Sequence, residues 1–152
     1  MHVVLVEPEI PANTGNISRT CAVTGTSLHL VKPLGFSVDD KHLKRAGLDY
    51  WHLLDLYYYD SFEEIQQKYP EYNFFFATTK AEKYYTDFVF KQNDFLVFGK
   101  ETAGLPVSIL KDNWEHCMRI PMGINLRSLN LSNSVAVILY EALRQQGFPN
   151  LS

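Results

Sequence analysis

Polar side chains crowd the stretch NLRSLNLSN (125–133), which directly precedes an apolar helical pattern near the end of the chain. One serine or asparagine is enough to cap the first turn of a helix, because its oxygen accepts a bond from a free N–H group. The excess of polar residues therefore predicts a loop that binds a ligand through hydrogen bonds. The six polar residues among these nine positions are Asn125, Arg127, Ser128, Asn130, Ser132 and Asn133.

A second polar group follows the first apolar run, in PEIPANTGNISRT (8–20). On a helix, Arg19 shares a face with Asn16, opposite Ile17. Arginine stays protonated in proteins, so Arg19 suits holding an anion or stabilising negative charge rather than accepting a proton. Two plainer interpretations remain open at this point. Asn13 or Thr14 could simply cap the helix, and Arg19 could be an ordinary surface residue.

A third candidate is the glycine-containing loop FGKETAGLP (98–106), where Gly99 and Gly104 allow close backbone approach to a ligand or supply a turn. The usual phosphate-binding loops are absent from the sequence: there is no GxGxxG after the first apolar run and no Walker loop. A GxSxG nucleophile elbow is absent too. Loops rich in hydroxyls, amides and backbone groups but poor in charge suit an adenosine with a zwitterionic tail.

The cysteines and histidines give no sign of a metal site. The five histidines and two cysteines lack ligand spacing, and there is no CxxC. Cys21 and Cys117 each lie among apolar neighbours, which is typical of free, buried thiols in a reducing cytoplasm. We therefore expect a protein without a structural or catalytic metal.

Length and composition indicate one globular domain over residues 1–152, with 46% hydrophobic and 20% charged residues. No apolar run approaches the roughly 20 residues that cross a bilayer, and the first residues resemble a strand rather than a signal peptide. The net charge of −3 argues against a general polyanion-coating protein. A local basic patch could still contact nucleic acid. The candidate is KHLKRAG (41–47), whose plainer interpretation is a solvated helix face.

Strand-like and helical patterns alternate along the chain, which predicts an α/β domain with a mostly parallel, doubly covered sheet. The segment 49–60 is ambiguous between helix and strand. Ligands bind such sheets beyond the carboxyl ends of the strands, which points to the loops after residues 76, 98 and 120. The expected strands are 2–7, 28–33, 73–79, 94–99 and 117–121, and the expected helices are 14–25, 39–47, 61–70, 106–112 and 131–147.

Three of these segments together resemble the signature motifs of the SPOUT methyltransferase family. They are the spacing of Asn13 and Arg19, the loop FGKETAGLP and the segment IPMGINLRSLNLSNSVAV. The sequence is most similar to the minimal TrmL (YibK) branch of that family, in EPEIPANTGNISR, KPLGF, RAGLDY and YEALRQQG. The resemblance extends over essentially the whole chain.

The resemblance implies a homodimer with a three-layer α/β/α fold and a deep trefoil knot in its C-terminal part. It also implies that S-adenosylmethionine binds the knot in a bent pose. Enzymes of this branch methylate the ribose 2′-oxygen of the wobble nucleotide, a cytidine or modified uridine at position 34, notably in leucine tRNAs. Carried over by position, the cofactor-binding residues are Ala77, Thr78, Gly99, Glu101, Ile120, Met122, Ser128 and Leu129.

The resemblance further implies roles in catalysis and RNA binding. Arg19 is the leading catalytic candidate, and Asn13 belongs to the same motif. By helix spacing, Asn133 and Tyr140 lie two turns apart on one face of the last expected helix, where they could help to place the ribose; for Tyr140, plain helix packing is the alternative. The tRNA anticodon stem-loop would be held by basic residues of both protomers. The RNA-binding candidates are Lys41, Lys44, Arg45 and Arg127.

Three alternatives stay open from the sequence. The chain could be a binding module that holds RNA or S-adenosylmethionine without catalysis, although Arg19 and the complete third motif favour an enzyme. It could be a 2′-O-methyltransferase that acts at another RNA site. A nucleotide-binding enzyme with other chemistry, such as a kinase-like protein, is disfavoured because the phosphate loop is missing.

Overall fold

The computed structural model describes residues 1–39, 41, 45 and 48–152. In this part of the chain, six strands form one sheet in the order β3-β2-β1-β5-β4-β6, and every pairing is parallel. The strands are β1 (His2–Val6), β2 (Ser27–Val31), β3 (Leu56–Tyr59), β4 (Phe74–Ala77), β5 (Phe95–Phe98) and β6 (Cys117–Met118).

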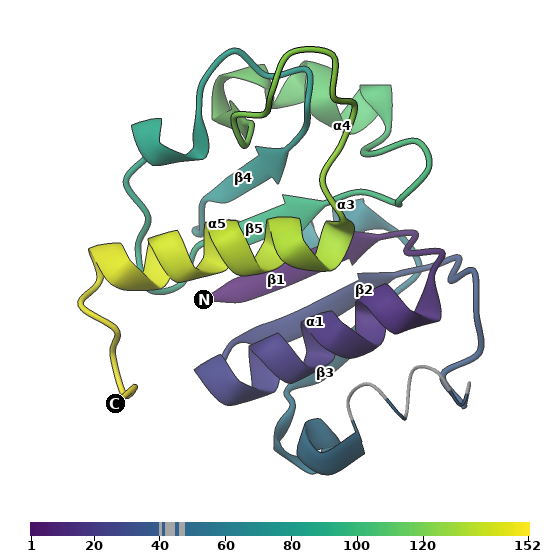
Figure 1. Ribbon diagram of the computed structural model, residues 1–152. Coiled ribbons are helices and arrows are strands. Elements are labelled where there is room, and N and C mark those ends of the chain that lie inside the picture. The colour runs from purple at the N-terminus through teal and green to yellow at the C-terminus, as the bar shows by residue number, and fades with distance from the viewer. Residues whose placement is uncertain (40, 42–44, 46–47) are drawn as a thin grey trace.

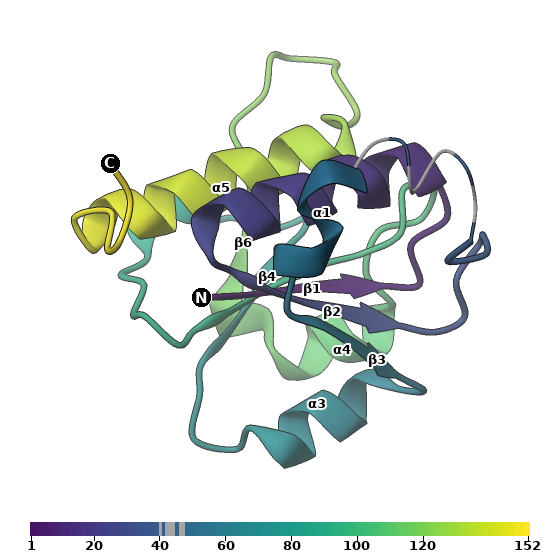
Figure 2. The same cartoon turned by 90° about the horizontal axis from the view of Figure 1, so that it is seen from below.

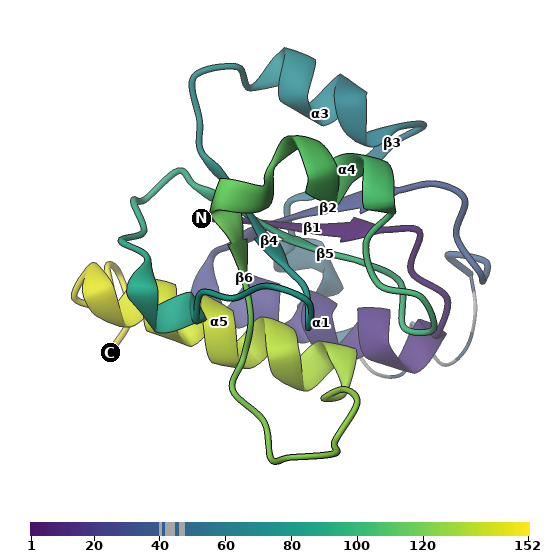
Figure 3. The ribbon, with the colours of Figure 1, turned by 90° about the horizontal axis from the view of Figure 1, so that it is seen from above.

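Helices cover both faces of this sheet, as the sequence predicts (Figures 1 and 3). One face packs against α1 (Pro11–Thr24) and α5 (Leu131–Gln145), and the other against α3 (Phe62–Lys68) and α4 (Val107–Asp112). Three short 3-10 helices complete the described part: η1 (Leu48–Leu53), η2 (Tyr85–Asp87) and η3 (Trp114–His116). The expected three-layer α/β/α arrangement is therefore confirmed.

The core shows why the central strands are apolar without alternation. In β1, Val3 and Leu5 are buried toward α1 and α5, whereas Val4 and Val6 are buried toward α3 and α4. A strand with both faces covered needs apolar side chains at every position. The loops at the carboxyl ends of the strands are left to carry the polar residues.

The first helix begins at Pro11 and ends at Thr24, whereas the sequence predicts 14–25. Proline suits the first helical position, since its fixed φ is already helical and its missing N–H is not needed there. Asn13 and Thr14 consequently lie inside the first turn, so neither caps the helix. The residue at the cap position is Ile10, which makes no side-chain cap bond.

Other boundaries shift for local reasons. The ambiguous segment 49–60 divides into η1 followed by β3. The strand expected at 117–121 shortens to two residues, because Arg119 bonds the segment beyond β4 instead: its N–H donates to the Lys83 carbonyl. The last helix ends at Gln145 rather than 147, close to the positive φ of 72° at Gly147. The expected helix at 39–47 lies largely outside the described residues.

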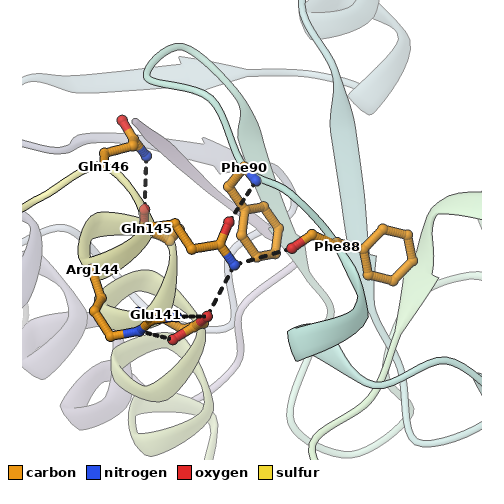
Figure 4. A network of polar contacts seen from close by, with 7 residues as sticks. Phe88, Phe90, Glu141, Arg144, Gln145 and Gln146 are labelled. Atoms are coloured by element: carbon orange, nitrogen blue, oxygen red, sulfur yellow. Dashed lines mark hydrogen bonds and ion pairs between the residues drawn. The ribbon is translucent and has the colours of Figure 1, made fainter.

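Gln145 joins the last helix to the segment that precedes β5 (Figure 4). Its amide nitrogen donates to the Phe88 carbonyl at 3.0 Å, and its amide oxygen accepts from the Phe90 N–H at 2.9 Å. Glu141 accepts a further bond from the same amide, at 2.9 Å. The Gln145 side chain thus bonds two backbone groups of the extended segment 88–90, the Phe88 carbonyl and the Phe90 N–H, and so fixes α5 against that segment.

Two histidines, His29 fully buried and His2 partly buried, form a cluster on the α3 face that was not predicted from the sequence. His2 Nδ1 and His29 Nε2 lie 3.0 Å apart, and His29 Nδ1 lies 3.3 Å from the Tyr59 hydroxyl. The ring of Phe95 stacks on His2 at 4.2 Å. Burial lowers the pKa of His2 to about 4, with the N-terminal charge adding to the effect. Burial and the neighbouring His2 lower the pKa of His29 to about 3.

We expect acid to destabilise the protein through this pair. Unfolding restores a histidine pKa near 6.5, so below that pH the unfolded chain binds more protons than the folded one. The contribution of this pair to the free energy of unfolding should be fully present above pH 6.5 and should decrease toward pH 4. The melting temperature should fall by about 2–4 °C for each kcal/mol lost. Thermal melts of the protein and of His29→Phe across this range test the prediction, since the variant should respond less to pH. The exposed His52, changed to glutamine, is the control.

Candidate functional site

A cavity of about 550 Å³ opens at the carboxyl ends of β4, β5 and β6, which is a usual size for a small-molecule site. Three loops line it: the one after β4, the one after β5 and the one between β6 and α5. These are the loops that the sequence pattern indicates. The structure brings all eight expected cofactor residues to this one cavity: Ala77, Thr78, Gly99, Glu101, Ile120, Met122, Ser128 and Leu129.

The loop after β5 closes on itself so tightly that position 99 must be glycine. The Gly104 N–H donates to the Lys100 carbonyl at 2.9 Å. A Cβ atom on Gly99 would lie 2.1 Å from the Gly104 carbonyl carbon and 2.2 Å from the Leu105 nitrogen. These are backbone atoms that cannot move aside without opening the turn. Gly99 therefore sets the shape of one cavity wall.

Glu101 lines the cavity, but its carboxylate bonds the start of α1. It accepts the backbone N–H of Glu9 at 2.8 Å, the N–H of Ile10 at 3.0 Å and the side-chain amide of Asn13 at 3.2 Å. A carboxylate at a helix N-terminus satisfies free N–H groups and complements the helix dipole. Glu101 thus holds the segment just before α1 and places a negative charge near the start of the helix, although it bonds none of the first-turn backbone N–H groups that an N-cap side chain would accept.

Two more contacts join the same loop to the segment before α1. The Glu9 carboxylate accepts from the Thr102 N–H and hydroxyl at 3.0 and 2.9 Å, and these bonds hold the pKa of Glu9 below its usual range. Lys100 donates to Glu7 at 2.9 Å, which raises the pKa of the lysine. The cavity loop and the start of α1 therefore form one hydrogen-bonded unit.

Asn13 extends this unit to the third loop. Its amide oxygen accepts from Asn130 Nδ2 at 3.1 Å. Asn130 in turn caps α5, since its oxygen accepts from the N–H groups of Ser132 and Asn133 at 2.9 and 3.3 Å. The chain of bonds from Glu101 through Asn13 to Asn130 thus connects the starts of α1 and α5. Asn130 is one of the six polar residues of the loop that the sequence singles out, but its bond to Asn13 was not predicted.

We expect Asn13→Ala to disturb this connection. The side chain is buried, and its loss would leave polar groups of Glu101 and Asn130 with fewer partners. The cost in unfolding free energy should be about 1–3 kcal/mol. Chemical denaturation measures it, and the exposed Asn16→Ala on the same helix is the matched control. Equal stability of the two variants would contradict the role of Asn13.

The catalytic candidates other than Asn13 lie outside the cavity of their own chain. Arg19 lies on the exposed face of α1, with Asn16 beside it and Ile17 buried behind, as the sequence predicts. Asn133 and Tyr140 lie on the exposed face of α5. Val137, on the same face of α5, is 37% exposed, so this face of the helix carries an apolar side chain that its own chain does not bury.

Basic side chains line the cavity even though the whole chain has a net charge of −3. Arg127 lines the cavity, as do Lys80 and Arg119, which the sequence analysis missed. Arg119 Nε is buried and has no hydrogen-bond partner in the described part of the chain, so it is free to donate to a ligand. Of the patch at 41–47, Lys41 and Arg45 are exposed, whereas Lys44 lies outside the described residues.

Comparison with known proteins identifies the class. Residues 1–140 match the SpoU rRNA Methylase family, which shows that the chain belongs to it. A tRNA (cytidine(34)-2′-O)-methyltransferase of Methylovorus glucosotrophus is 52% identical over 148 residues, covering 96% of each protein. A Geobacillus stearothermophilus protein provisionally given the same name is 54% identical over 155 residues, covering 100% of this chain and 99% of the relative.

A solved structure agrees with this membership. The structure described as "Structural insights into the 2-OH methylation of C/U34 on tRNA" superposes with a TM-score of 0.91 at 43% identity, covering 96% of this chain and 95% of the other. The chain is therefore an RNA methyltransferase of the SpoU type.

Two further observations concern metal and membrane. Among the described residues, no group of three or more histidine, cysteine, aspartate or glutamate side chains is placed to hold a metal ion. Cys21 and Cys117 are free and buried. None of the described helices is both long enough and apolar enough to cross a bilayer.

Proposed function

We propose that this enzyme transfers a methyl group from S-adenosylmethionine to the ribose 2′-oxygen of nucleotide 34 in tRNA. The observation that carries the proposal is the cavity at the strand ends, whose three loops hold every expected cofactor residue. Relatives that share half of the sequence are named for methylation at cytidine 34. Cytidine or modified uridine in leucine tRNAs is the substrate that we propose, and free cysteines fit work in the cytoplasm.

The residues around the cavity fit S-adenosylmethionine. Apolar side chains such as Leu105, Ile120 and Ile138 supply walls for an adenine ring, and backbone groups of the three loops supply hydrogen bonds. A related SpoU structure, from Streptomyces viridochromogenes, is described as a complex with AdoMet; it is 26% identical, has a TM-score of 0.84, and the match covers 96% of this chain and 57% of that one. When bound, the cofactor supplies an electrophilic methyl group, and the proposal requires no metal.

Arg19 is the residue that we assign to activating the acceptor. A ribose hydroxyl is a poor nucleophile, so the site must stabilise the developing alkoxide and align the oxygen with the methyl group. A guanidinium can donate to the alkoxide or clamp the adjacent phosphate. We assign Asn133 and Tyr140 to placing the ribose, and Asn13 to holding the loops as described above.

The position of Arg19 supports a homodimer. Arg19, Asn133 and Tyr140 face outward from α1 and α5, which lie side by side on one face of the molecule (Figure 1). Apolar side chains share that surface: Val23 is 45% exposed and Val137 37%. We infer that two copies pack through α1 and α5, and that Arg19 of one protomer completes the cavity of its partner. The same proposal includes a deep trefoil knot in the C-terminal part of the chain. It also includes contacts to RNA through Lys41, Lys44, Arg45 and Arg127.

Mixed dimers test this arrangement. Arg19→Ala and Ser128→Trp should each inactivate a homodimer, the first at the reacting oxygen and the second by filling the cavity. Co-expression with two tags isolates dimers with one copy of each. Such dimers should regain activity, because one intact cavity then meets an intact Arg19 from the partner. Inactive mixed dimers, or a monomer in sedimentation at micromolar concentration, would contradict the proposal.

Transfer of labelled methyl from S-adenosylmethionine to total tRNA tests the function itself. Label should enter tRNA, and nuclease mapping should place it on the ribose of nucleotide 34. Cofactor binding without transfer would indicate a binding module instead. Label at a different nucleotide would indicate a 2′-O-methyltransferase with another RNA site.

A further inference from the structure

Arg19 lies against an aromatic ring that has no role in the reaction as proposed above. Its guanidinium carbon lies 5.0 Å from the centre of the Tyr50 ring. This is within the distance at which a cation over a ring face is attracted to it. In the described part of the chain, no acidic side chain forms a salt bridge with Arg19. The ring is therefore the group that orients the guanidinium.

The nature of this partner matters for the chemistry. A carboxylate would neutralise the guanidinium and occupy the N–H donors that a substrate oxygen needs. An aromatic face restricts the long side chain but leaves its charge and its in-plane N–H groups available. A tyrosine ring can therefore fix a catalytic arginine and leave its N–H donors unpaired until RNA binds.

Two elements bring the pair together. Arg19 lies on α1, whose opposite face is buried against the sheet. Tyr50 is half-buried in η1, the short helix that packs beside α1 (Figure 2). The Leu54 N–H donates to the Trp51 carbonyl at 3.2 Å and closes the last turn of η1. The ring is therefore held by the fold rather than by a free loop.

We propose that Tyr50 is a positioning residue for the methyl transfer, which holds the Arg19 guanidinium in the orientation that the reaction uses. The proposal rests on the role assigned to Arg19 above. It concerns the face of the ring and not its hydroxyl. It also separates two functions in the segment RAGLDY, because the basic residue Arg45 is exposed for RNA whereas Tyr50 acts on Arg19.

Steady-state kinetics with Tyr50 variants test the assignment. Tyr50→Leu and Tyr50→Met remove the ring face and should lower kcat by about 3- to 30-fold, the range expected from losing a cation–π contact. Tyr50→Phe keeps the face and should retain nearly full kcat. The KM for tRNA, the Kd for S-adenosylmethionine by calorimetry and the melting temperature should change little in Tyr50→Phe and Tyr50→Met. The exposed Tyr58→Leu is the control and should behave as the unmodified protein.

A double variant separates positioning from general packing. In an Arg19→Ala background, Tyr50→Leu should cause no further loss of kcat, because the group that the ring orients is already gone. Additive losses, or a Tyr50→Phe variant as slow as Tyr50→Leu, would overturn the assignment. Normal kcat in Tyr50→Leu and Tyr50→Met beside an impaired Arg19→Ala would overturn it and leave the proposed function standing. Normal turnover in Arg19→Ala would instead remove the role of Arg19 on which the assignment rests.

Discussion

Arg19→Ala is expected to lower the rate of methyl transfer by about 100-fold or more, the scale of losing one preorganised donor to a developing oxyanion. The side chain lies on the exposed face of α1, and the buried face of that helix is formed by residues such as Ile17 and Cys21. Its removal should therefore leave the core intact. S-adenosylmethionine should bind the variant normally, because the expected cofactor residues all lie in the three cavity loops and Arg19 is assigned to the acceptor hydroxyl instead.

Single-turnover transfer to tRNA measures this effect, with calorimetry for the cofactor and thermal melts for the fold. Arg19→Lys should restore only part of the rate, because a point charge cannot reproduce the planar guanidinium fork. Asn16→Ala, on the same face of α1, is the matched control for surface changes. The mechanism is falsified if Arg19→Ala keeps near-normal turnover. Loss of cofactor binding, or early melting, would make Arg19 a structural residue instead.

Gly99→Ala should have the second large effect, on cofactor affinity. The new methyl group would meet backbone atoms of Gly104 and Leu105 at distances that real Cβ atoms do not reach, so the loop must open. Overpacking of this kind costs about 1–3 kcal/mol. If this amount is added to the free energy of the cofactor-bound state, the Kd for S-adenosylmethionine should rise by about 10- to 100-fold.

The control for this variant is another glycine. Gly25 ends α1 with a positive φ of 64°, and a Cβ there would meet nothing within 4 Å. Gly25→Ala should therefore cost about 1–2 kcal/mol of stability through left-handed backbone strain and leave the Kd unchanged. Calorimetric titration of both variants distinguishes the cases. An unchanged Kd in Gly99→Ala would show that the loop does not form the cofactor wall.

The sequence predicts the strands and the loops of this site well, for physical reasons. Doubly buried strands such as Phe95–Phe98 are continuous apolar runs, and parallel strands place their carboxyl ends at one edge. The helix expected at 61–70 begins as α3 at Phe62, and the Ser61 hydroxyl caps it by accepting from the Glu64 N–H. Family motifs added the residues in the loops, where periodicity has no information.

Long-range polar contacts could not be predicted in the same way. Glu101 bonds the start of α1 across 92 residues, and Asn130 bonds Asn13 across 117. Neither spacing leaves a local pattern, so the sequence predicts Glu101 in a cofactor loop but not its bonds to the segment before α1. The His2–His29 pair was missed likewise, because parallel pairing of β1 and β2 brings together two histidines that are 27 residues apart.

The bonds from Glu101 to the segment before α1 have a consequence for synthesis on the ribosome. While the first 90 residues emerge, the N–H groups of Glu9 and Ile10 just before α1 lack the carboxylate that they bond, and β1 lacks its neighbour β5. The N-terminal part therefore cannot reach its final state as an autonomous unit, and most of the chain must leave the exit tunnel first. Dependence on contacts between residues far apart in the sequence slows folding, and it leaves nascent apolar strands exposed to chaperones and proteases. The residues that shape the site thus also set when the chain can fold.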